Sequence, residues 1–127
     1  MIKILMIGIG GFIGSVLRYS ISTFAYRLIG SDFPYGTLIV NILGSAAIGL
    51  FMGLVENGVV ISTNIRVFIA VGILGGFTTF SSFSYETIWK LKQGEIYSAL
   101  TNIFLNVLLC LGATWIGLVF AKYITTR

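Results

Sequence analysis

Three long stretches of this chain contain no charged residue, and their length restricts the possible folds more than any other feature. Gly36–Val55 runs for 20 residues, Val67–Tyr85 for 19 and Ile96–Ala121 for 26 without Asp, Glu, Lys or Arg. A transmembrane helix needs about 20 predominantly apolar residues to cross a bilayer. A fourth apolar stretch, Ile4–Ile29, is interrupted only by two arginines. The sequence therefore predicts an all-α membrane protein with four spans.

The composition agrees with a single domain embedded in a lipid bilayer. Charged residues make up 9% of the 127 residues, whereas a soluble domain carries about 25%. The predicted connections, Gly30–Tyr35, Glu56–Asn64 and Lys90–Glu95, are too short for another domain. We therefore expect one four-helix transmembrane domain over residues 1–127. Its first stretch should be a span and not a cleaved signal peptide, because Arg18 follows the apolar run where a small-residue cleavage site would stand.

Several classes of protein are excluded by the residue types present. There is no His, the acidic residues form no cluster, and the single Cys110 cannot form an intrachain disulfide. The run Gly8–Gly14 misses the dinucleotide-binding spacing because position 13 is Ile. The net charge of +4 comes from scattered basic residues that flank apolar spans, as in membrane anchoring. We expect neither an enzyme nor a nucleic-acid-binding protein.

Small and polar residues recur at every fourth position along two spans. The stripes are Thr37, Asn41, Ser45, Gly49 and Gly53 on the second span, and Ser98, Asn102, Asn106, Cys110 and Thr114 on the fourth. Residues four apart share one helix face. The glycines and Ser45 are expected to pack helices together. The asparagines are open to two interpretations, helix packing or a polar path, because unpaired polar groups in hydrocarbon are costly.

The third span contains an unusual segment, "GGFTTFSSFS", from Gly75 to Ser84. Gly is a poor helix former, and Ser and Thr compete for backbone hydrogen bonds. We therefore predict that the helix is broken at its centre, near Gly75–Thr79. Broken backbone at membrane depth is tolerated only where it is buried in protein or lines a cavity. The break thus indicates a functional site.

Two aromatic rings follow the predicted break. Phe80 and Phe83 are three residues apart, so they are neighbours on the resumed helix. Aromatic rings have positive edges, which attract an anion weakly. Hydroxyls such as those of Thr79 and Ser81 and the asparagine amides would supply hydrogen-bond donors. This lining suits a small hydrated anion, although two phenylalanines that only pack between helices would also explain the pattern.

The charges that flank the spans choose no orientation clearly. One side of the membrane would receive four basic residues and the other side three: Lys3, Arg66, Lys122 and Arg127 against Arg27, Lys90 and Lys92. The positive-inside rule needs a clear imbalance. We therefore expect that the chain inserts both ways and forms an antiparallel two-fold homodimer, since four thin helices enclose little space and two-fold pairs are the commonest assembly.

Three motifs resemble those of the Fluc family of small dual-topology fluoride channels, also described as fluoride exporters. "GGFTTFSSFSYE" resembles the family's central signature, "GTLIVNILGS" its second-helix motif and "GGFIGSVLRY" its first-helix motif. The size, the four-span layout and the loop positions also agree, so the resemblance covers nearly the whole chain.

The resemblance implies two fluoride pores in an antiparallel homodimer. The residues that match pore positions are Phe80, Phe83, Asn41 and Thr37, together with the neighbouring Thr79 and Ser81 and the fourth-helix positions Asn102 and Asn106. Arg18 matches an arginine near the pore mouth, and Glu86 matches the acid after the motif. Gly75 and Thr78 match residues whose carbonyls hold a structural Na⁺ at the dimer interface. Two breaks that face each other across a two-fold axis would favour the same hard cation, because carbonyl oxygens are its ligands.

The resulting hypothesis is a fluoride-selective channel of the prokaryotic plasma membrane that gives passive efflux of cytoplasmic fluoride and so reduces its toxicity. A proton-coupled small multidrug exporter is the alternative, but that class needs an acidic residue deep in a span, and spans one, two and four have none. A structural assembly protein would explain the packing stripes but not the broken helix.

Overall fold

The computed structural model describes residues 1–127, and its regular structure is entirely helical. Its elements are α1 (Ile2–Ile29), α2 (Tyr35–Glu56), α3 (Thr63–Arg66), η1 (Val67–Leu74), α4 (Gly75–Phe77), α5 (Phe80–Lys92) and α6 (Ile96–Thr125). Four helical segments are long and apolar enough to cross a membrane: Ile2–Ile29, Tyr35–Glu56, Thr63–Lys92 and Ile96–Thr125. The four predicted spans are confirmed.

The third span is interrupted where the sequence predicted a break. After α4, Thr78 has φ −82° and ψ 157°, and Thr79 has φ −148° and ψ 119°, so both residues are extended before α5 begins. The segment before α4 was not predicted: η1 is a π-helix of eight residues. Its composition, all apolar except for Gly72, gives no signal that separates a π-helix from an α-helix.

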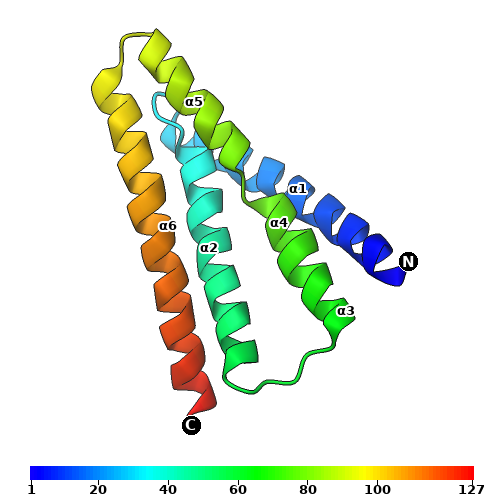
Figure 1. Ribbon diagram of the computed structural model, residues 1–127. Coiled ribbons are helices and arrows are strands. Elements are labelled where there is room, and N and C mark those ends of the chain that lie inside the picture. Colours follow the sequence, from blue (N-terminus) through cyan, green and yellow to red (C-terminus); the bar gives the residue numbers. More distant parts are fainter.

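The four spans pack as two pairs (Figure 1). α2 lies beside α6, and α1 lies against η1 and α4 of the third span. α5 leaves this second pair at the break and packs against α6. The third span therefore begins beside α1 and ends beside α6, and the break at Thr78 and Thr79 is the point at which it changes partner.

Glycines on the predicted stripes allow α2 and α6 to approach closely. A Cβ added at Gly49 would collide with the backbone of Thr114, and one added at Gly53 would come within 2.6 Å of the Ala121 Cβ. On α6, a Cβ at Gly117 would lie 2.5 Å from the Ala46 carbonyl oxygen. The expectation that Gly49 and Gly53 of the stripe pack helices is confirmed, and this packing brings the polar residues of both stripes together.

α1 meets the third span in the same way, and this contact gives a stability prediction. A Cβ added at Gly10 would lie 2.5 Å from the Phe68 carbonyl oxygen, whereas one at Gly8 would meet nothing within 4 Å. Overpacking costs about 1–3 kcal/mol, and replacing a helical Gly by Ala gains about 1 kcal/mol. We therefore expect Gly10→Ala to lower the thermal unfolding midpoint in detergent and the control Gly8→Ala to raise it. Equal upward shifts in both variants would contradict the close packing.

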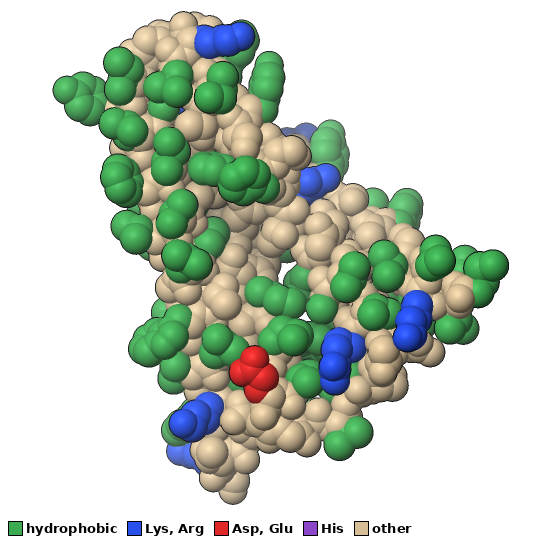
Figure 2. Space-filling model, in the orientation of Figure 1, with side chains coloured by type: hydrophobic (Ala, Val, Ile, Leu, Met, Phe, Trp, Pro, Cys, Tyr) green, Lys and Arg blue, Asp and Glu red, His purple; other side chains and the backbone are tan.

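The outer surface is suited to lipid. Apolar side chains are spread over the whole face shown in Figure 2, and only a few charged side chains lie among them. Large residues such as Phe12 (72% exposed) and Phe104 (61% exposed) point away from the protein. So much exposed apolar surface on four long helices is stable only in contact with lipid or protein. Together with the four spans, this surface identifies an integral membrane protein.

Candidate functional site

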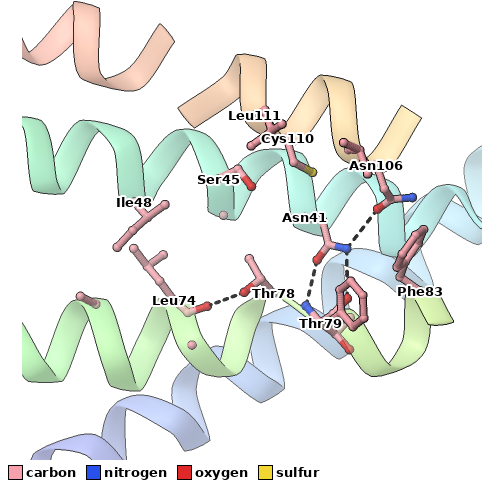
Figure 3. Close-up of a pocket in the computed structure, with 15 residues that line it drawn as sticks. Asn41, Ser45, Ile48, Leu74, Thr78, Thr79, Phe83, Asn106, Cys110 and Leu111 are labelled. Atoms are coloured by element: carbon pink, nitrogen blue, oxygen red, sulfur yellow. Dashed lines mark hydrogen bonds between the residues drawn. The ribbon is translucent and has the colours of Figure 1, made fainter. Parts of the chain in front are cut away.

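A cleft of about 450 Å³ opens beside the break in the third span. It lies between α2 and α6 on one side and η1, α4 and the start of α5 on the other, in the hollow of Figure 2. Seven of the residues singled out from the sequence line it: Asn41, Gly75, Thr78, Thr79, Phe80, Phe83 and Asn106. Ser45 and Cys110 of the two stripes also lie on its wall. Figure 3 shows the cleft and labels seven of these residues: Asn41, Ser45, Thr78, Thr79, Phe83, Asn106 and Cys110.

Asn41 holds the broken backbone in place. Its Oδ1 accepts a hydrogen bond from the Thr79 amide at 2.8 Å, and its Nδ2 donates to the Thr79 carbonyl at 3.1 Å (Figure 3). In an unbroken helix the Thr79 amide would donate to the Gly75 carbonyl. Asn41 therefore replaces a lost helical bond, and an unpaired backbone amide at membrane depth is avoided.

Thr79 also begins the helix that carries the two rings. Its hydroxyl accepts a hydrogen bond from the Ser82 amide at 3.2 Å, as expected of an N-cap threonine. The Ser81 hydroxyl lies 3.3 Å from the Thr79 hydroxyl. One residue thus joins α2 to α5 through its backbone and starts α5 through its side chain. The hydroxyl-rich segment serves first to break and restart the helix.

The two phenylalanines lie together on the cleft wall. The ring centroids of Phe80 and Phe83 are 5.3 Å apart, with an angle of 60° between the planes. Edge-to-face is one of the two arrangements that aromatic pairs prefer, and in it the positive edge of one ring points at the negative face of the other. The Phe80 ring is 77% exposed in the single chain, so it is available to a partner or a solute.

A chain of amides extends from the cleft wall into the interior. Asn41 Nδ2 also donates to Asn106 Oδ1 at 3.2 Å, and Asn106 Nδ2 donates to the Asn102 side-chain and backbone oxygens, both at 2.9 Å. Both N–H groups of the Asn41 amide and both of the Asn106 amide are therefore already bonded within the protein. Asn102 is 0% exposed and does not line the cleft.

Thr37 and Glu86 form a separate pair outside this cleft. The buried Thr37 hydroxyl donates to Glu86 Oε1 at 2.7 Å, whereas the buried Glu86 Oε2 has no hydrogen-bond partner. The sequence singled out both residues without indicating that they meet. Arg18 is half-buried on α1 and lines neither this cleft nor the second hollow described next.

A second, polar hollow lies at the end of the bundle where α1, α2 and α5 end or begin, and Glu86 and Lys90 line it. The buried Lys90 ammonium donates to the Asp32 carbonyl at 2.9 Å and forms an ion pair with Glu95 at 3.0 Å. Lys90 thus connects the loop before α2 with the turn before α6. Sequence reasoning treated Lys90 only as a flanking charge, because nothing in its spacing shows that it folds inward.

Two residues expected to hold a cation lie where carbonyl ligands are available. Gly75 and Thr78 line the cleft, and the Thr79 amide is bonded to Asn41 instead of the Gly75 carbonyl. The extended conformation of Thr78 takes its own carbonyl out of the helical ladder. No group of His, Cys, Asp or Glu in the chain could hold a metal ion. Backbone oxygens without a carboxylate fit a hard monovalent cation.

Comparisons with known proteins assign the chain to a family. Residues 5–118 match the family described as CrcB-like protein, Camphor Resistance (CrcB). A fluoride-specific ion channel FluC of Geotalea daltonii is 45% identical over 121 residues, which cover 95% of this chain and 98% of that protein. A FluC of Campylobacter lari is 48% identical over 94% of this chain and 97% of its own length. A FluC of Clostridium perfringens is 52% identical over 81% of this chain and 80% of its own length.

These relatives are ion channels of nearly the same length as this chain, and the family match over residues 5–118 includes most of each of the four spans and all residues that line the cleft. The resemblance of the three motifs and the expectation that the protein is not an enzyme are both confirmed. The chain belongs to the CrcB family, the family of the fluoride-specific ion channels FluC.

Proposed function

We propose that this chain is one subunit of a fluoride channel that works as an antiparallel homodimer with two pores and lets cytoplasmic fluoride leave passively. The observation that carries the proposal is the cleft at the broken helix, which brings Asn41, Phe80 and Phe83 together in a chain of the FluC family. The family membership argues against the alternative of a small multidrug exporter.

The pore would follow the cleft wall. Ring edges of Phe80 and Phe83 attract an anion weakly and cannot trap it as a fixed positive charge would. Thr79, Asn41 and Asn106 supply polar groups on the cleft wall beside the rings. Ser81 does not line the cleft in the single chain and would contribute through its contact with the Thr79 hydroxyl. Since the amide hydrogens of Asn41 are all bonded, fluoride would take one of them from an internal acceptor. The bond from Asn41 Nδ2 to Asn106 Oδ1, at 3.2 Å, is the longest that this amide makes.

Other predicted site residues would act away from the rings. Thr37 and Glu86 would form a second polar station along the path, and Arg18 would attract anions near the mouth. Asn102 has no access to the cleft in the single chain, so it would act through its neighbours.

A second copy of the chain would close the cleft. More than half of the residues that line the cleft are hydrophobic, and Phe80 is exposed in the single chain. Contact of this apolar surface with water would be unfavourable, so a protein partner that covers it would stabilise the cleft. An antiparallel copy would bring its own break to the same depth in the bilayer, because the break lies near the middle of the third span. Each pore would then be walled by helices of both subunits.

Fluoride efflux from liposomes that contain the purified protein tests this function. We expect fluoride release through the protein when potassium fluoride is trapped inside and valinomycin carries the potassium. Chloride release should be much slower, and a pH gradient should not drive uptake of an organic cation. Liposomes that release no more fluoride than protein-free ones would contradict the proposal.

The cation proposal makes a separate prediction. Gly75 and Thr78 carbonyls from two subunits would bind one Na⁺ at the dimer interface, where it would stay and raise the potential for a passing anion. We expect fluoride current in a planar bilayer to fade when a bulky organic cation replaces sodium on both sides, and to return when sodium is restored. A current that persists indefinitely without sodium would show that the ion is not needed.

A further inference from the structure

Two buried polar residues, Thr87 on α5 and Asn102 on α6, lie outside the cleft but are hydrogen-bonded to each other and to Asn106 of the cleft wall. Thr87 is 5% exposed and Asn102 is 0% exposed, and neither lines the cleft. Polar side chains at such a depth are costly unless every bond is made. Their hydrogen bonds extend the amide network of the cleft wall, which runs from Asn41 on α2 through Asn106 and Asn102 on α6 to Thr87 on α5.

The hydrogen bonds of this side-chain network all have the same donor-to-acceptor direction, from Asn41 through Asn106 and Asn102 to Thr87. The Thr87 hydroxyl donates to the Phe83 carbonyl at 2.8 Å, so its oxygen is left to accept from Asn102 Nδ2 at 2.9 Å. With its Nδ2 committed to Thr87, the Asn102 amide presents Oδ1 to Asn106 Nδ2. Each donor thus fixes the orientation of the next amide, and such chains strengthen their members.

The amide orientation that begins at Thr87 also determines how the Asn106 and Asn41 amides of the cleft wall are turned. Because Asn106 Nδ2 is bonded to Asn102, Asn106 Oδ1 faces Asn41, whose Nδ2 covers it at 3.2 Å. A reversed Asn106 amide would place its N–H groups against those of Asn41 and leave oxygens without donors. The present orientation keeps the negative amide oxygen of Asn106 covered, and it leaves one Asn41 N–H on an acceptor that a passing anion could replace.

The same hydrogen-bond network also contacts the backbone of the two helix turns that carry Phe80 and Phe83. Asn41 bonds to the backbone of Thr79 just before Phe80, and Thr87 bonds to the carbonyl of Phe83. The segment from Thr79 to Thr87 is therefore held at two points by one network.

We propose that Thr87 and Asn102 are positioning residues for fluoride permeation, which set the direction of the Asn106 and Asn41 amides and hold the turn of Phe83 without touching the ion. The proposal rests on the proposed function of the cleft. It differs from a packing role, because the hydroxyl of Thr87 matters through its hydrogen-bond direction and not through its volume.

The test compares three single variants in the liposome assay. Thr87→Val keeps the shape and removes the hydroxyl, and Thr87→Ser keeps the hydroxyl. Thr101→Val is the matched control, since the Thr101 hydroxyl donates to the Tyr97 carbonyl four residues earlier at 2.8 Å but has no asparagine donor. We expect Thr87→Val to lower fluoride release about tenfold and to lower the fluoride-to-chloride ratio, as loss of a buried hydrogen bond would. Thr87→Ser and Thr101→Val should stay within about twofold of the unchanged protein.

A fold defect is separated from a positioning defect by a second variant. Thr87→Val with Asn102→Leu removes both partners of the Thr87–Asn102 bond, so no unpaired amide is buried at position 102. Asn106 Nδ2 loses its bond to Asn102 Oδ1 but keeps the one to the backbone carbonyl of residue 102. This double variant should elute as the same oligomer and still show the lowered fluoride-to-chloride ratio. An unchanged ratio in a folded Thr87→Val or double variant would overturn the proposal. Absence of fluoride release from the unchanged protein would instead overturn the proposed function.

Discussion

Replacing Phe83 by Ile is expected to lower fluoride release from liposomes about tenfold or more, and Phe80→Ile should have a similar effect. Isoleucine keeps much of the bulk and the apolar character but has no ring edge with positive charge. An edge interaction of about 1.4 kcal/mol, near the upper end of the range for aromatic contacts, corresponds to about tenfold in rate. The two rings are neighbours on the cleft wall with centroids 5.3 Å apart, so replacing either ring changes the same part of the path.

The control for this prediction is Phe24→Ile. Phe24 is 62% exposed on α1 and does not line the cleft, so the same chemical change there removes an aromatic ring from lipid-facing surface. We expect its fluoride release to match the unchanged protein. All three variants should elute as the same oligomer. If both Phe80→Ile and Phe83→Ile release fluoride at the original rate, the rings only pack between helices.

The spans and the break were predictable because each depends on local composition. An uncharged stretch of the right length needs no partner to be recognised, and all four stretches form helices. The break was predictable for a similar reason, since Gly75, Gly76, Thr78 and Thr79 each weaken a helix by themselves. Its exact position at Thr78 and Thr79 agrees with this local chemistry.

The partners within the site were not predictable, because they depend on how helices far apart in sequence are rotated against each other. Asn41 was expected beside a polar path, yet its bonds to the Thr79 backbone require α2 to face the break. Thr87 gave no signal at all, since a threonine inside a helix usually bonds only to the carbonyl four residues earlier. Its second bond exists because Asn102 reaches it from α6.

The π-helix η1 was missed for a different reason. A π-helix changes the number of residues per turn without changing the composition, and Val67–Leu74 would be equally apolar as an α-helix. In the structure the segment lies against α1, where a Cβ added at Gly72 would lie 3.0 Å from the Gly10 Cα. The close backbone contact between two glycines on separate spans could not be read from either span alone.

The orientation of the chain gives the second prediction with a large expected effect. The basic residues at the two ends of the spans number four and three, so a small change in count should decide how the chain inserts. Adding several lysines after Arg127 should direct all chains one way. If the active unit is an antiparallel pair, these chains lack partners of the opposite orientation, and fluoride release from cells or liposomes should fall to less than about a tenth.

Restoration by a partner chain distinguishes lost pairing from a damaged protein. A second version biased the other way carries Lys122→Gln and Arg127→Gln to remove charge from the first end, and Gln93→Lys to add charge at the other. Gln93 is exposed in the turn between α5 and α6, so the new lysine should be tolerated. Each version alone should be inactive, because each inserts in one orientation only. Producing both versions together should restore fluoride release, since the two insert in opposite directions and can pair. Full activity of either version alone, with its single orientation confirmed by cysteine labelling from one side, would show that the channel does not need antiparallel subunits.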